Sequence, residues 1–437
     1  MLWQAEVVAT LSEDLRFRGL VYQVSDDELL ARLDKGGMSA YIGFDPTNDS
    51  LQLGNLLQLC TLRRLQLAGH RPIVVAGGGT ALIGDPGGKT EERQLLTHEQ
   101  VRANLEAIRP QLARFLDFEG GPSRRPALLV DNADWLMGLS YVEFLRDVGK
   151  HVTINQMAAK DAVKARLERP DQGISYAEFS YMLLQAYDYL HLYDAEGCTL
   201  QLGASDQWGS ITTGIDLIRK LRGATAYALT SPLVVKADGT KYGKSDAGAI
   251  FLDPRRTSPF AFYQHLLRAE DAVVGTYLRY LTFLSHDEIL ALDEATASRP
   301  EQREAQRMLA RGLTGMVHGE VETRRAEAAA AALYSEEIAG LDEPTLLSAL
   351  ADAPHSEVPA RRLEEAGGYE LVVALVDSGL VASRRAARQA IAQGGVYLNN
   401  RRARLPDDER LTRGHCIAGR YVLLRRGRRD VHLLAFA

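Results

Sequence analysis

Two lysines near the middle of the chain could hold a polyphosphate. The segment reads K-A-D-G-T-K-Y-G-K-S over residues 236–245, with Lys241 and Lys244 on either side of a glycine and the hydroxyl of Ser245 next to them. The two ammonium groups could converge on a triphosphate, and the glycines would permit backbone motion. The D-G pair is also a strong hairpin-turn signal, so a solvated turn is the alternative.

A second candidate lies where an apolar run ends in F-D-P-T and N-D-S-L-Q-L-G-N opens a helical pattern at about Asn55. A helix N-terminus presents free N–H groups and a positive dipole end, and so it binds phosphate readily. Gly54 would let a ligand approach the backbone, and Asp45 could hold an amino or hydroxyl group at the end of the strand. An ordinary strand–loop–helix with an Asx turn at Asn48–Asp49 is the alternative.

The glycine-rich stretch VVAGGGTALIGDPGGKTEER, residues 74–93, also follows an apolar run. It has neither G-x-G-x-x-G in the usual place nor the Walker spacing, which argues against a common P-loop or dinucleotide site. Asp85 lies in a tight G-D-P turn, where it could cap a helix or face a ligand amine.

Strands and helices alternate around these segments. Short apolar runs bounded by Gly, Pro or polar residues predict buried strands at 40–44, 72–77, 126–130 and 199–203. Helical patterns lie between them, at 55–68, 98–116, 139–148 and 207–222. This alternation predicts an α/β fold with a parallel, doubly wound sheet, whose ligands bind at the carboxyl ends of the strands.

The remainder of the chain has a different pattern. Residues 258–350 lack strand signals and are rich in Ala, Leu, Glu and Arg, which predicts a helical domain. Residues 351–368 predict a linker, and residues 369–437 a small α+β unit. From Glu370 to Ala437 there are 13 Lys+Arg and 6 Asp+Glu, a net charge of +7 in a chain of net charge −6. Such a basic module predicts contact with nucleic acid; a solvated basic surface is the alternative.

The composition is that of a soluble globular protein with roughly two to four domains. No apolar run is long enough for a transmembrane helix, and the N-terminus does not resemble a signal peptide. The three cysteines, Cys60, Cys198 and Cys416, are far apart and indicate neither a zinc site nor a disulfide framework. We therefore expect a cytoplasmic protein.

Taken in order, several longer motifs resemble the class I aminoacyl-tRNA synthetases, and within them the bacterial tyrosyl-tRNA synthetases. The resemblance extends from about residue 10 to the C-terminus. The motifs that carry it are YIGFDPT (41–47), LIGDP (82–86), FLRDVGKH (144–151), QGISYAEFSYMLLQAYD (172–188), QLGASDQWGS (201–210), KADGTKYGKS (236–245) and LDPRRTSPFAFYQ (252–264). The last segment resembles a small RNA-binding module that these enzymes share with a ribosomal protein and pseudouridine synthases, which agrees with its basic charge.

The resemblance implies a tyrosine site. Tyr41 and Asp188 would hydrogen-bond the phenol oxygen, and this pair would discriminate against phenylalanine, which leaves both groups unpaired. The α-amino group would be held by Asp85, Tyr181 and Gln185, with Gln207 beside the substrate. Tyr181, Gln185 and Asp188 are spaced i, i+4 and i+7, which places them on one helix face. A polar, solvated stripe is the alternative for these three.

The resemblance also implies an ATP site. Asp206 would bind the adenylate ribose, Asp45 would lie near the adenylate and the amine, and Thr47 would contact the γ-phosphate. Gly43, Gly54 and Gly203 would complete the adenylate site. Lys89 and Arg93 match a mobile pair that contacts pyrophosphate. Lys241, Lys244 and Ser245 form a KMSKS-type loop within a region at 233–257.

The chain departs from the resemblance around the nucleotide. Where the family has H-I-G-H, this sequence has Gln52-Leu53-Gly54-Asn55. A glutamine amide is a neutral, longer donor than the usual histidine, and we predict that activation is slower by roughly one to three powers of ten if that contact weakens. Further departures are Gln58, Ala204 and Ser210. The ATP pocket is therefore predicted to be altered, and the tyrosine pocket intact.

The implied reaction is attack of the tyrosine carboxylate on the α-phosphorus of ATP, followed by transfer of tyrosyl to tRNA(Tyr). Mg²⁺ would accompany ATP, without a protein-bound metal or organic cofactor. Residues 1–232 would form a Rossmann-type catalytic domain, with an insertion at about 120–165 in a homodimer interface. The helical domain and the tail would bind tRNA, with phosphate contacts from Arg384, Arg385, Arg388, Arg401, Arg402 and Arg404. No membrane partner is expected.

Three hypotheses follow. The first is a working tyrosyl-tRNA synthetase, with a second-copy enzyme that tolerates an adenylate-mimicking inhibitor as a variant. The second is an enzyme that supplies tyrosyl-adenylate or tyrosyl-tRNA to a biosynthetic pathway. The third is a non-catalytic RNA-binding relative, against which the retained Lys241, Lys244, Asp206 and Asp188 argue. Tyrosine-dependent ATP–pyrophosphate exchange distinguishes them.

Overall fold

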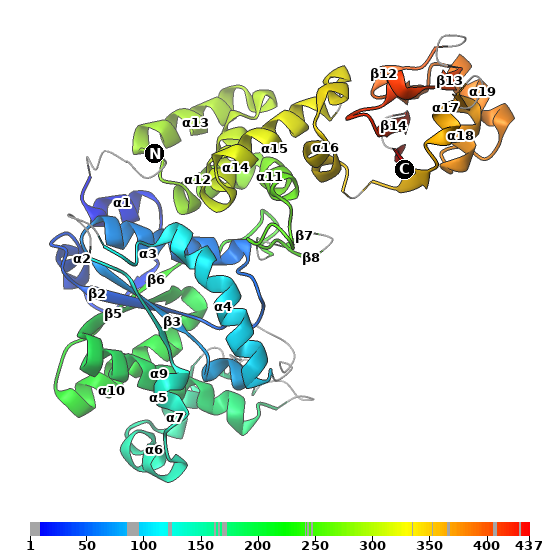
Figure 1. Ribbon diagram of the computed structural model, residues 1–437. Helices are drawn as coiled ribbons and strands as arrows, with labels where there is room; N and C mark the ends of the chain where they lie inside the picture. Colours follow the sequence, from blue (N-terminus) through cyan, green and yellow to red (C-terminus); the bar gives the residue numbers. More distant parts are fainter. Residues whose placement is uncertain are drawn as a thin grey trace. The chain divides into compact units, whose positions relative to one another are not determined.

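The computed structural model forms two compact units (Figure 1). It describes residues 9–84, 96–120, 125–160, 163–164, 167, 173–240, 242, 244–245, 248–333, 335–351, 353–364, 368–404, 409–427 and 430–437. The first unit comprises Met1–Thr257 and Arg268–Val317, and the second comprises Ser258–Leu267 and His318–Ala437. None of the described helices has both the length and the apolar character needed to cross a bilayer.

The first unit is built on a six-stranded sheet. Its strands are β1 (Gln23–Val24), β2 (Ser39–Phe44), β3 (Arg71–Ala76), β4 (Leu128–Asp131), β5 (Cys198–Ala204) and β6 (Tyr227–Ser231), in the spatial order β1-β6-β5-β2-β3-β4. All neighbouring pairs are parallel except β1 with β6. The parallel sheet and its four predicted strands are confirmed. β1 and β6 were not predicted, because each is a short run whose position in the sheet depends on pairing with a distant segment.

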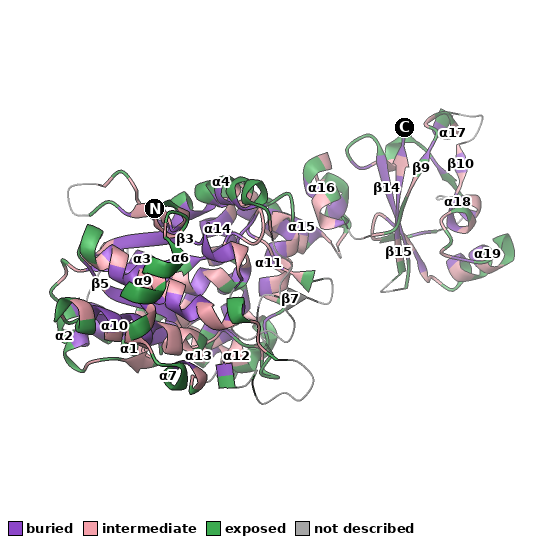
Figure 2. Cartoon of the chain, turned by 90° about the horizontal axis from the view of Figure 1, so that it is seen from below, coloured by how far each residue is buried: buried purple, intermediate pink, exposed green. Residues whose placement is uncertain are grey.

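Helices flank this sheet. They are α1 (Leu11–Phe17), α2 (Glu28–Leu33), α3 (Leu56–Leu67), α4 (His98–Phe115), α5 (Ala133–Leu136), α6 (Tyr141–Asp147), α7 (Ile154–Ala158), α9 (Tyr176–Glu196) and α10 (Trp208–Arg222). The four predicted helical patterns correspond to α3, α4, α6 and α10. Ser175 caps the start of α9, and Gly197 ends it with a left-handed backbone at φ +59°. Figure 2 shows the burial of strands β3 and β5 and of much of α3.

The predicted helical region divides between the units. α12 (Asp271–Leu281), α13 (His286–Ser298) and most of α14 (Glu304–His318) belong to the first unit. α11 (Pro259–Leu267), α15 (Glu320–Ala332) and α16 (Glu343–Ala349) belong to the second. The helical content is as predicted, but residues 258–350 do not form a separate compact unit, since α11 packs on α15 and α16 instead of on its sequence neighbour α12.

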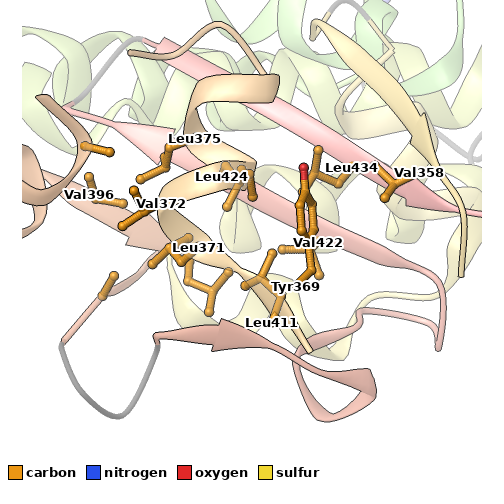
Figure 3. Close-up of a cluster of buried hydrophobic side chains, with 14 of the residues drawn as sticks. Val358, Tyr369, Leu371, Val372, Leu375, Val396, Leu411, Val422, Leu424 and Leu434 are labelled. Atoms are coloured by element: carbon orange, nitrogen blue, oxygen red, sulfur yellow. The ribbon is translucent and has the colours of Figure 1, made fainter. Parts of the chain in front are cut away.

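The second unit contains a five-stranded sheet in the order β12-β11-β14-β15-β9. Its strands are β9 (His355–Val358), β11 (Val396–Leu398), β12 (Arg401–Arg402), β14 (Tyr421–Arg426) and β15 (Asp430–Phe436). α17 (Arg361–Glu364), α18 (Leu371–Asp377) and α19 (Arg384–Ala392) accompany it, with the short pair β10 (Tyr369–Glu370) and β13 (Arg410–Leu411). Leu371 and Leu375 of α18 pack there with Val422, Leu424 and Leu434 of the sheet (Figure 3).

The predicted linker at 351–368 is wrong in one part. Residues 355–358 form β9, an edge strand that pairs in parallel with β15. Prolines and acids suggested a connecting segment, but the strand is stabilised by hydrogen bonds to residues about eighty positions later in the chain, a partner that the local composition does not reveal.

Candidate active site

A cavity of about 460 Å³ opens at the carboxyl ends of β2 and β5 in the first unit. This is where a parallel, doubly wound sheet binds its ligands. Most of the described candidate residues line it, namely Tyr41, Gly43, Asp45, Thr47, Gln52, Gly54, Asn55, Gln58, Tyr181, Gln185, Asp188, Gly203, Asp206 and Gln207. The structure thus brings the strand–loop–helix candidate and the α9 candidate together.

Some candidates cannot be placed in this cavity. Asp85, Lys89, Arg93 and Lys241 lie outside the described residues. Lys244 and Ser245 form strand β7, which pairs with β8 (Gly248–Ala249), and only their backbone is described.

One end of the cavity is formed by a buried tyrosine and a buried carboxylate. Tyr41 is 2% exposed, and its hydroxyl has no hydrogen-bond partner among the residues that the structure describes. Asp188 accepts hydrogen bonds from Asn132 Nδ2 at 3.0 Å and from Trp135 Nε1 at 2.8 Å. Burial raises the pKa of Asp188 to about 7, although these two donors act in the opposite direction. A hydroxyl and a carboxylate are therefore available to a ligand in a nearly dry site.

Asp45 forms a second polar contact region. Its carboxylate accepts from Thr80 Oγ1 and from the Tyr181 hydroxyl, both at 3.0 Å. A methyl group at Gly77 would lie 2.1 Å from Asp45 Oδ1, and one at Gly78 would lie 2.0 Å from Asp131. These two glycines are therefore required by packing against carboxylates, which explains a glycine-rich stretch that lacks a nucleotide-binding spacing.

Helix α9 turns its predicted polar face into the cavity. Tyr181, Gln185 and Asp188 all line it, so the solvated-stripe alternative is wrong. Gln185 Nε2 donates to Gln207 Oε1 at 3.3 Å. Gln185 Oε1 and Gln201 Oε1 are buried and have no partner among the described residues. Both acceptors are therefore available to a bound molecule.

Several polar residues at this end carry no motif in the sequence, namely Thr80, Asn132, Trp135 and Gln201. Asn132 and Trp135 follow β4 directly, at the same edge of the sheet as the other site residues. The rule that ligands bind at the carboxyl ends of parallel strands could have found them. Gln201 was recognisable as a polar residue inside the apolar run T-L-Q-L-G.

The opposite end of the cavity is made by the loop that enters α3. Gln52 N donates to Asn55 Oδ1 at 2.8 Å, so the asparagine side chain closes the turn Leu53–Asn55. Asn55 Nδ2 retains donor capacity by its chemistry. The loop is held by backbone hydrogen bonds from Leu53 N to Ile250 O at 2.9 Å and from Leu252 N to Leu51 O at 2.8 Å. Contacts from residues about two hundred positions away therefore fix the turn before the helix.

Gly203 and Gln58 lie in the same half of the cavity. A methyl group at Gly203 would be 2.9 Å from Ile211 Cδ1, so glycine lets helix α10 approach the end of β5. Gln58 Nε2 donates to Ser231 Oγ at 3.1 Å, which joins α3 to the end of β6. Asp206, in the turn before α10, is exposed at the cavity wall.

The lysine segment begins at this end as well. Val234 and Tyr242 line the cavity, and Tyr242 N donates to Val234 O at 2.9 Å. Lys236 N bonds to Thr240 O at 2.8 Å, and Gly239 has φ +80°. The D-G turn suggested as an alternative is therefore present, and it lies within a segment that reaches the cavity.

The arginine candidates of the tail lie in the second unit. Arg384, Arg385 and Arg388 are exposed on α19, and Arg401, Arg402 and Arg404 are exposed in and after β12. Within the described part of the chain, no group of three or more His, Cys, Asp or Glu side chains could hold a metal ion.

Comparison with known proteins relates both units to one kind of enzyme. Residues 33–335 match the family described as tRNA synthetases class I (W and Y), and residues 350–434 match the tyrosine–tRNA ligase SYY-like C-terminal domain. The second match includes β9, in agreement with its place in the sheet.

Individual relatives extend over nearly the whole chain. A tyrosine–tRNA ligase of Roseiflexus castenholzii is 52% identical over 429 residues, which cover 98% of this chain and 99% of that protein. A tyrosine–tRNA ligase of Bacillus caldotenax is 47% identical over 98% of this chain and 100% of its own length. The truncated mitochondrial tyrosyl-tRNA synthetase of Aspergillus nidulans superposes with a TM-score of 0.65 at 30% identity, over 74% of this chain and 94% of that one. The chain belongs to the class I tRNA synthetases, in the family that comprises the tryptophan and tyrosine enzymes.

Proposed function

We propose that this chain is a tyrosine–tRNA ligase, which converts L-tyrosine and ATP to tyrosyl-adenylate and pyrophosphate and then transfers the tyrosyl group to tRNA(Tyr). The observation that carries the proposal is the buried pair at the end of the cavity, where the Tyr41 hydroxyl, which has no partner among the described residues, and the Asp188 carboxylate line one space. A phenol satisfies both groups, since its oxygen accepts from Tyr41 while its O–H donates to Asp188. Phenylalanine would leave both unsatisfied, which costs binding energy in a buried site.

The other end of tyrosine is assigned to the polar groups around Asp45. The α-ammonium group is placed among Tyr181, Gln185 and Asp85, with Asp45 and Gln207 next to it. Support comes from two polar pairs that line the cavity, in which the Tyr181 hydroxyl donates to Asp45 and Gln185 Nε2 donates to Gln207. In this orientation the tyrosine carboxylate points toward the loop before α3.

The chemical step needs no protein nucleophile. The tyrosine carboxylate oxygen attacks the α-phosphorus of ATP in line with the leaving pyrophosphate, and the bond from that phosphorus to the bridging oxygen breaks. Catalysis then consists of positioning and of stabilising the charge that develops on pyrophosphate. The phosphates are assigned to Thr47, Gln52, Asn55, Lys89, Arg93, Lys241, Lys244 and Ser245. Asp206 holds the ribose, the backbone at Gly43, Gly54 and Gly203 admits the nucleotide, and Mg²⁺ enters with ATP as part of the substrate.

Tyrosine-dependent ATP–pyrophosphate exchange tests this proposal, with phenylalanine in place of tyrosine as the matched substrate. We expect exchange with tyrosine and a Tyr41→Phe variant that loses part of the preference over phenylalanine. Exchange that is equal for the two amino acids would contradict the assignment of the phenol site. Charging of tRNA(Tyr) then separates a translation enzyme from one that uses another acceptor.

The chain is proposed to act as a homodimer through the insertion at about 120–165. Apolar side chains are exposed there on short helices, namely Met137 (55%), Tyr141 (61%), Val142 (72%), Leu145 (40%) and Ile154 (71%). An exposed apolar cluster of this kind is typical of a protein–protein interface, and we propose that a second copy of the chain binds there. Sedimentation of Val142→Asp should show dissociation, whereas Leu290→Asp, an exposed leucine on α13, should leave the dimer unchanged.

The second unit is proposed to bind tRNA through the exposed arginines of α19 and of the segment in and after β12. Each phosphate contact that is removed should lower the slope of log affinity against log salt by about 0.7 to 0.9. The triple variant Arg384→Gln, Arg385→Gln, Arg388→Gln should therefore show a shallower salt dependence, and Arg109→Gln on α4 serves as the control. A slope that stays unchanged in the triple variant would contradict this assignment.

A second candidate role is a second-copy synthetase that tolerates an adenylate-mimicking inhibitor. The specific observation in its favour is the contact of Gln58 with Ser231, which joins two residues of the altered nucleotide end. Tight inhibition by a stable tyrosyl-adenylate analogue would argue against this role.

The buried free thiols of Cys60 and Cys198 fit the proposed cytoplasmic location.

A further inference from the structure

Tyr242, which lies between Lys241 and Lys244 in the sequence, is buried against helix α12. Its ring stacks on that of Tyr277, with centroids 4.1 Å apart and an interplanar angle of 28°. Tyr242 is 8% exposed and Tyr277 only 1%. The Tyr277 hydroxyl also donates to Val235 O at 2.7 Å. The side chain of Tyr277 therefore contacts Val235, before the D-G turn, and Tyr242, after it.

The backbone of Tyr242 lies against the loop that enters α3. A methyl group built on Gly54 would be 3.9 Å from Tyr242 O, and Tyr242 N bonds to Val234 O. In the sequence, Lys241 and Lys244 lie within two residues of Tyr242. The backbone of Tyr242 is therefore held close to the turn at the N-terminus of α3.

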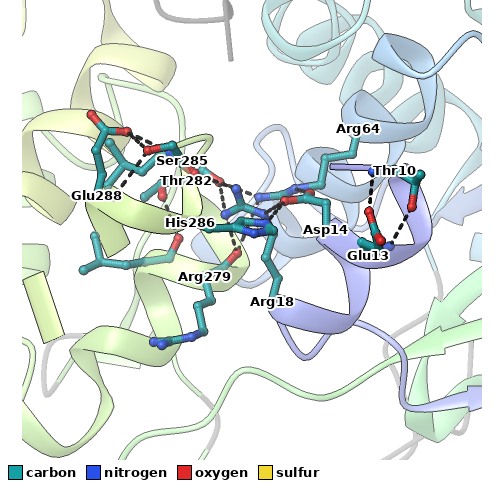
Figure 4. Close-up of polar contacts among 12 residues, drawn as sticks. Thr10, Glu13, Asp14, Arg18, Arg64, Arg279, Thr282, Ser285, His286 and Glu288 are labelled. Carbon is teal, nitrogen blue, oxygen red and sulfur yellow. Dashed lines mark hydrogen bonds and ion pairs between the residues drawn. The ribbon is translucent and has the colours of Figure 1, made fainter. Parts of the chain in front are cut away.

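Helix α12 is in turn bound to α1 and α3 by a buried polar cluster (Figure 4). Asp14 of α1 accepts from Arg18 Nε at 2.7 Å, and Arg64 Nε of α3 lies 3.5 Å from its other oxygen. Arg18 Nη1 donates to Thr282 O and Arg64 Nη1 to Tyr280 O, at 3.1 and 3.2 Å. These carbonyls belong to the C-terminal end of α12, where backbone acceptors lack partners within the helix and cations are favourable.

Two elements of the nucleotide end thus share one support. Arg64 lies in the last turn of α3, and Asn55 lies at the N-terminus of the same helix. Tyr277 of α12 contacts the lysine segment at Tyr242. Side chains that act on the same triphosphate from two sides must keep one spacing for the phosphates to fit, and a displacement of about 1 Å can cost roughly a hundredfold in rate.

We propose that Tyr242 and Tyr277 are positioning residues for the activation step. Their stack fixes the chain at Tyr242 on α12, which Arg18 and Arg64 fix to α3. This anchor would let the neighbouring lysines and the α3 N-terminus keep one spacing across the triphosphate. The inference rests on the proposed contact of the lysines with the phosphates. Both tyrosines act through the backbone and through α12, without touching the reacting atoms.

ATP–pyrophosphate exchange with separate variation of ATP and tyrosine tests the proposal. Tyr277→Leu and Tyr242→Leu should each lower kcat by roughly 10- to 100-fold and leave the KM for tyrosine within about twofold. Tyr242→Phe keeps the stacked ring and should recover most of that loss. Tyr280→Leu is the matched control, since Tyr280 is a half-buried tyrosine of the same helix that lies beside Gly19.

A Lys244→Ala variant separates this inference from the proposed function. If the tyrosines act through the lysine segment, adding Tyr277→Leu to Lys244→Ala should slow exchange by no more than about twofold. Full multiplication of the two effects, or an equal loss in Tyr280→Leu, would overturn the positioning role. An unchanged rate in Lys244→Ala would overturn the proposed role of the lysines, and the inference with it.

Discussion

The two ends of the active-site cavity are built in different ways. At the tyrosine end, side chains on a strand and a long helix are buried, and Asp188 is fixed by Asn132 and Trp135. At the nucleotide end, the turn at Gln52 is held by backbone bonds from residues 250–252. If the proposed assignment holds, the amino acid is recognised by a preformed set of side chains, and ATP activation depends on how the loops are held.

This division has a physical reason. Discrimination between a phenol and a benzene ring requires groups that are costly to leave unpaired, and that cost is large only where water is excluded. A triphosphate carries enough charge to be bound by N–H groups and cations on exposed loops. The tyrosine end therefore tolerates little change, and the nucleotide end has room for substitutions such as glutamine and asparagine in place of two histidines.

Asp188→Asn should have the largest effect, because it changes the buried carboxylate at the tyrosine end of the cavity. The variant keeps the size of the side chain but loses the charge that accepts the phenol O–H, and kcat/KM for tyrosine should fall roughly 10²- to 10³-fold. The KM for ATP should change little. A comparable rise in the KM for ATP would show that the two ends are not independent.

Gln52→His changes the nucleotide end of the cavity and should raise activity instead of lowering it. A histidine donor near the leaving phosphate should raise kcat for exchange roughly 10- to 100-fold, with the KM for tyrosine unchanged. Pre-steady-state formation of tyrosyl-adenylate measures the step directly. If the rate stays the same or falls, the glutamine is an adapted residue in this pocket and not a handicap.

The pKa of Asp188, about 7, predicts a pH dependence that belongs to the tyrosine end alone. The ionised carboxylate is the stronger acceptor for the phenol O–H, so on the proposed assignment tyrosine affinity should rise as the pH increases toward 7 and level off above it. Binding of ATP should lack this step. Between about pH 4 and 7, Asp188 keeps its proton in the folded, ligand-free protein but not in the unfolded chain. Asp188 therefore lowers the free energy of unfolding as pH rises through that range.

Titration of Asp188→Asn gives the control for both effects. The variant should show neither the rise in tyrosine affinity nor the loss of stability between about pH 4 and 7. If the same pH step is present in the variant, another group is responsible for it.

Trp135→Phe should have the smallest effect of the four. It tests how much one hydrogen-bond donor to Asp188 contributes at the tyrosine end of the cavity. It removes one N–H donor from Asp188 and keeps an aromatic ring, so kcat/KM for tyrosine should fall roughly 3- to 10-fold. The pH step should move upward, since the donor holds the pKa of Asp188 down. A fall in activity without that move would indicate a packing role for the ring.

The sequence alone determined most of the sheet and much of the site. Alternating apolar runs specified four of its strands and the helices between them, because burial requires a regular pattern of apolar residues. The spacing of Tyr181, Gln185 and Asp188 specified one helix face, and the family motifs specified the residues around the cavity.

Other features depended on contacts between distant segments. Asn132 and Trp135 support Asp188 only because β3 brings β4 to the edge of the sheet where α9 passes, and β9 is a strand only because β15 lies beside it. The division of the helical region and the stack of Tyr242 on Tyr277 are likewise fixed by packing partners far away in the chain. Local sequence determines which residues prefer a helix, a strand or burial, but hydrogen bonds and contacts between distant segments form only when the tertiary structure brings them together.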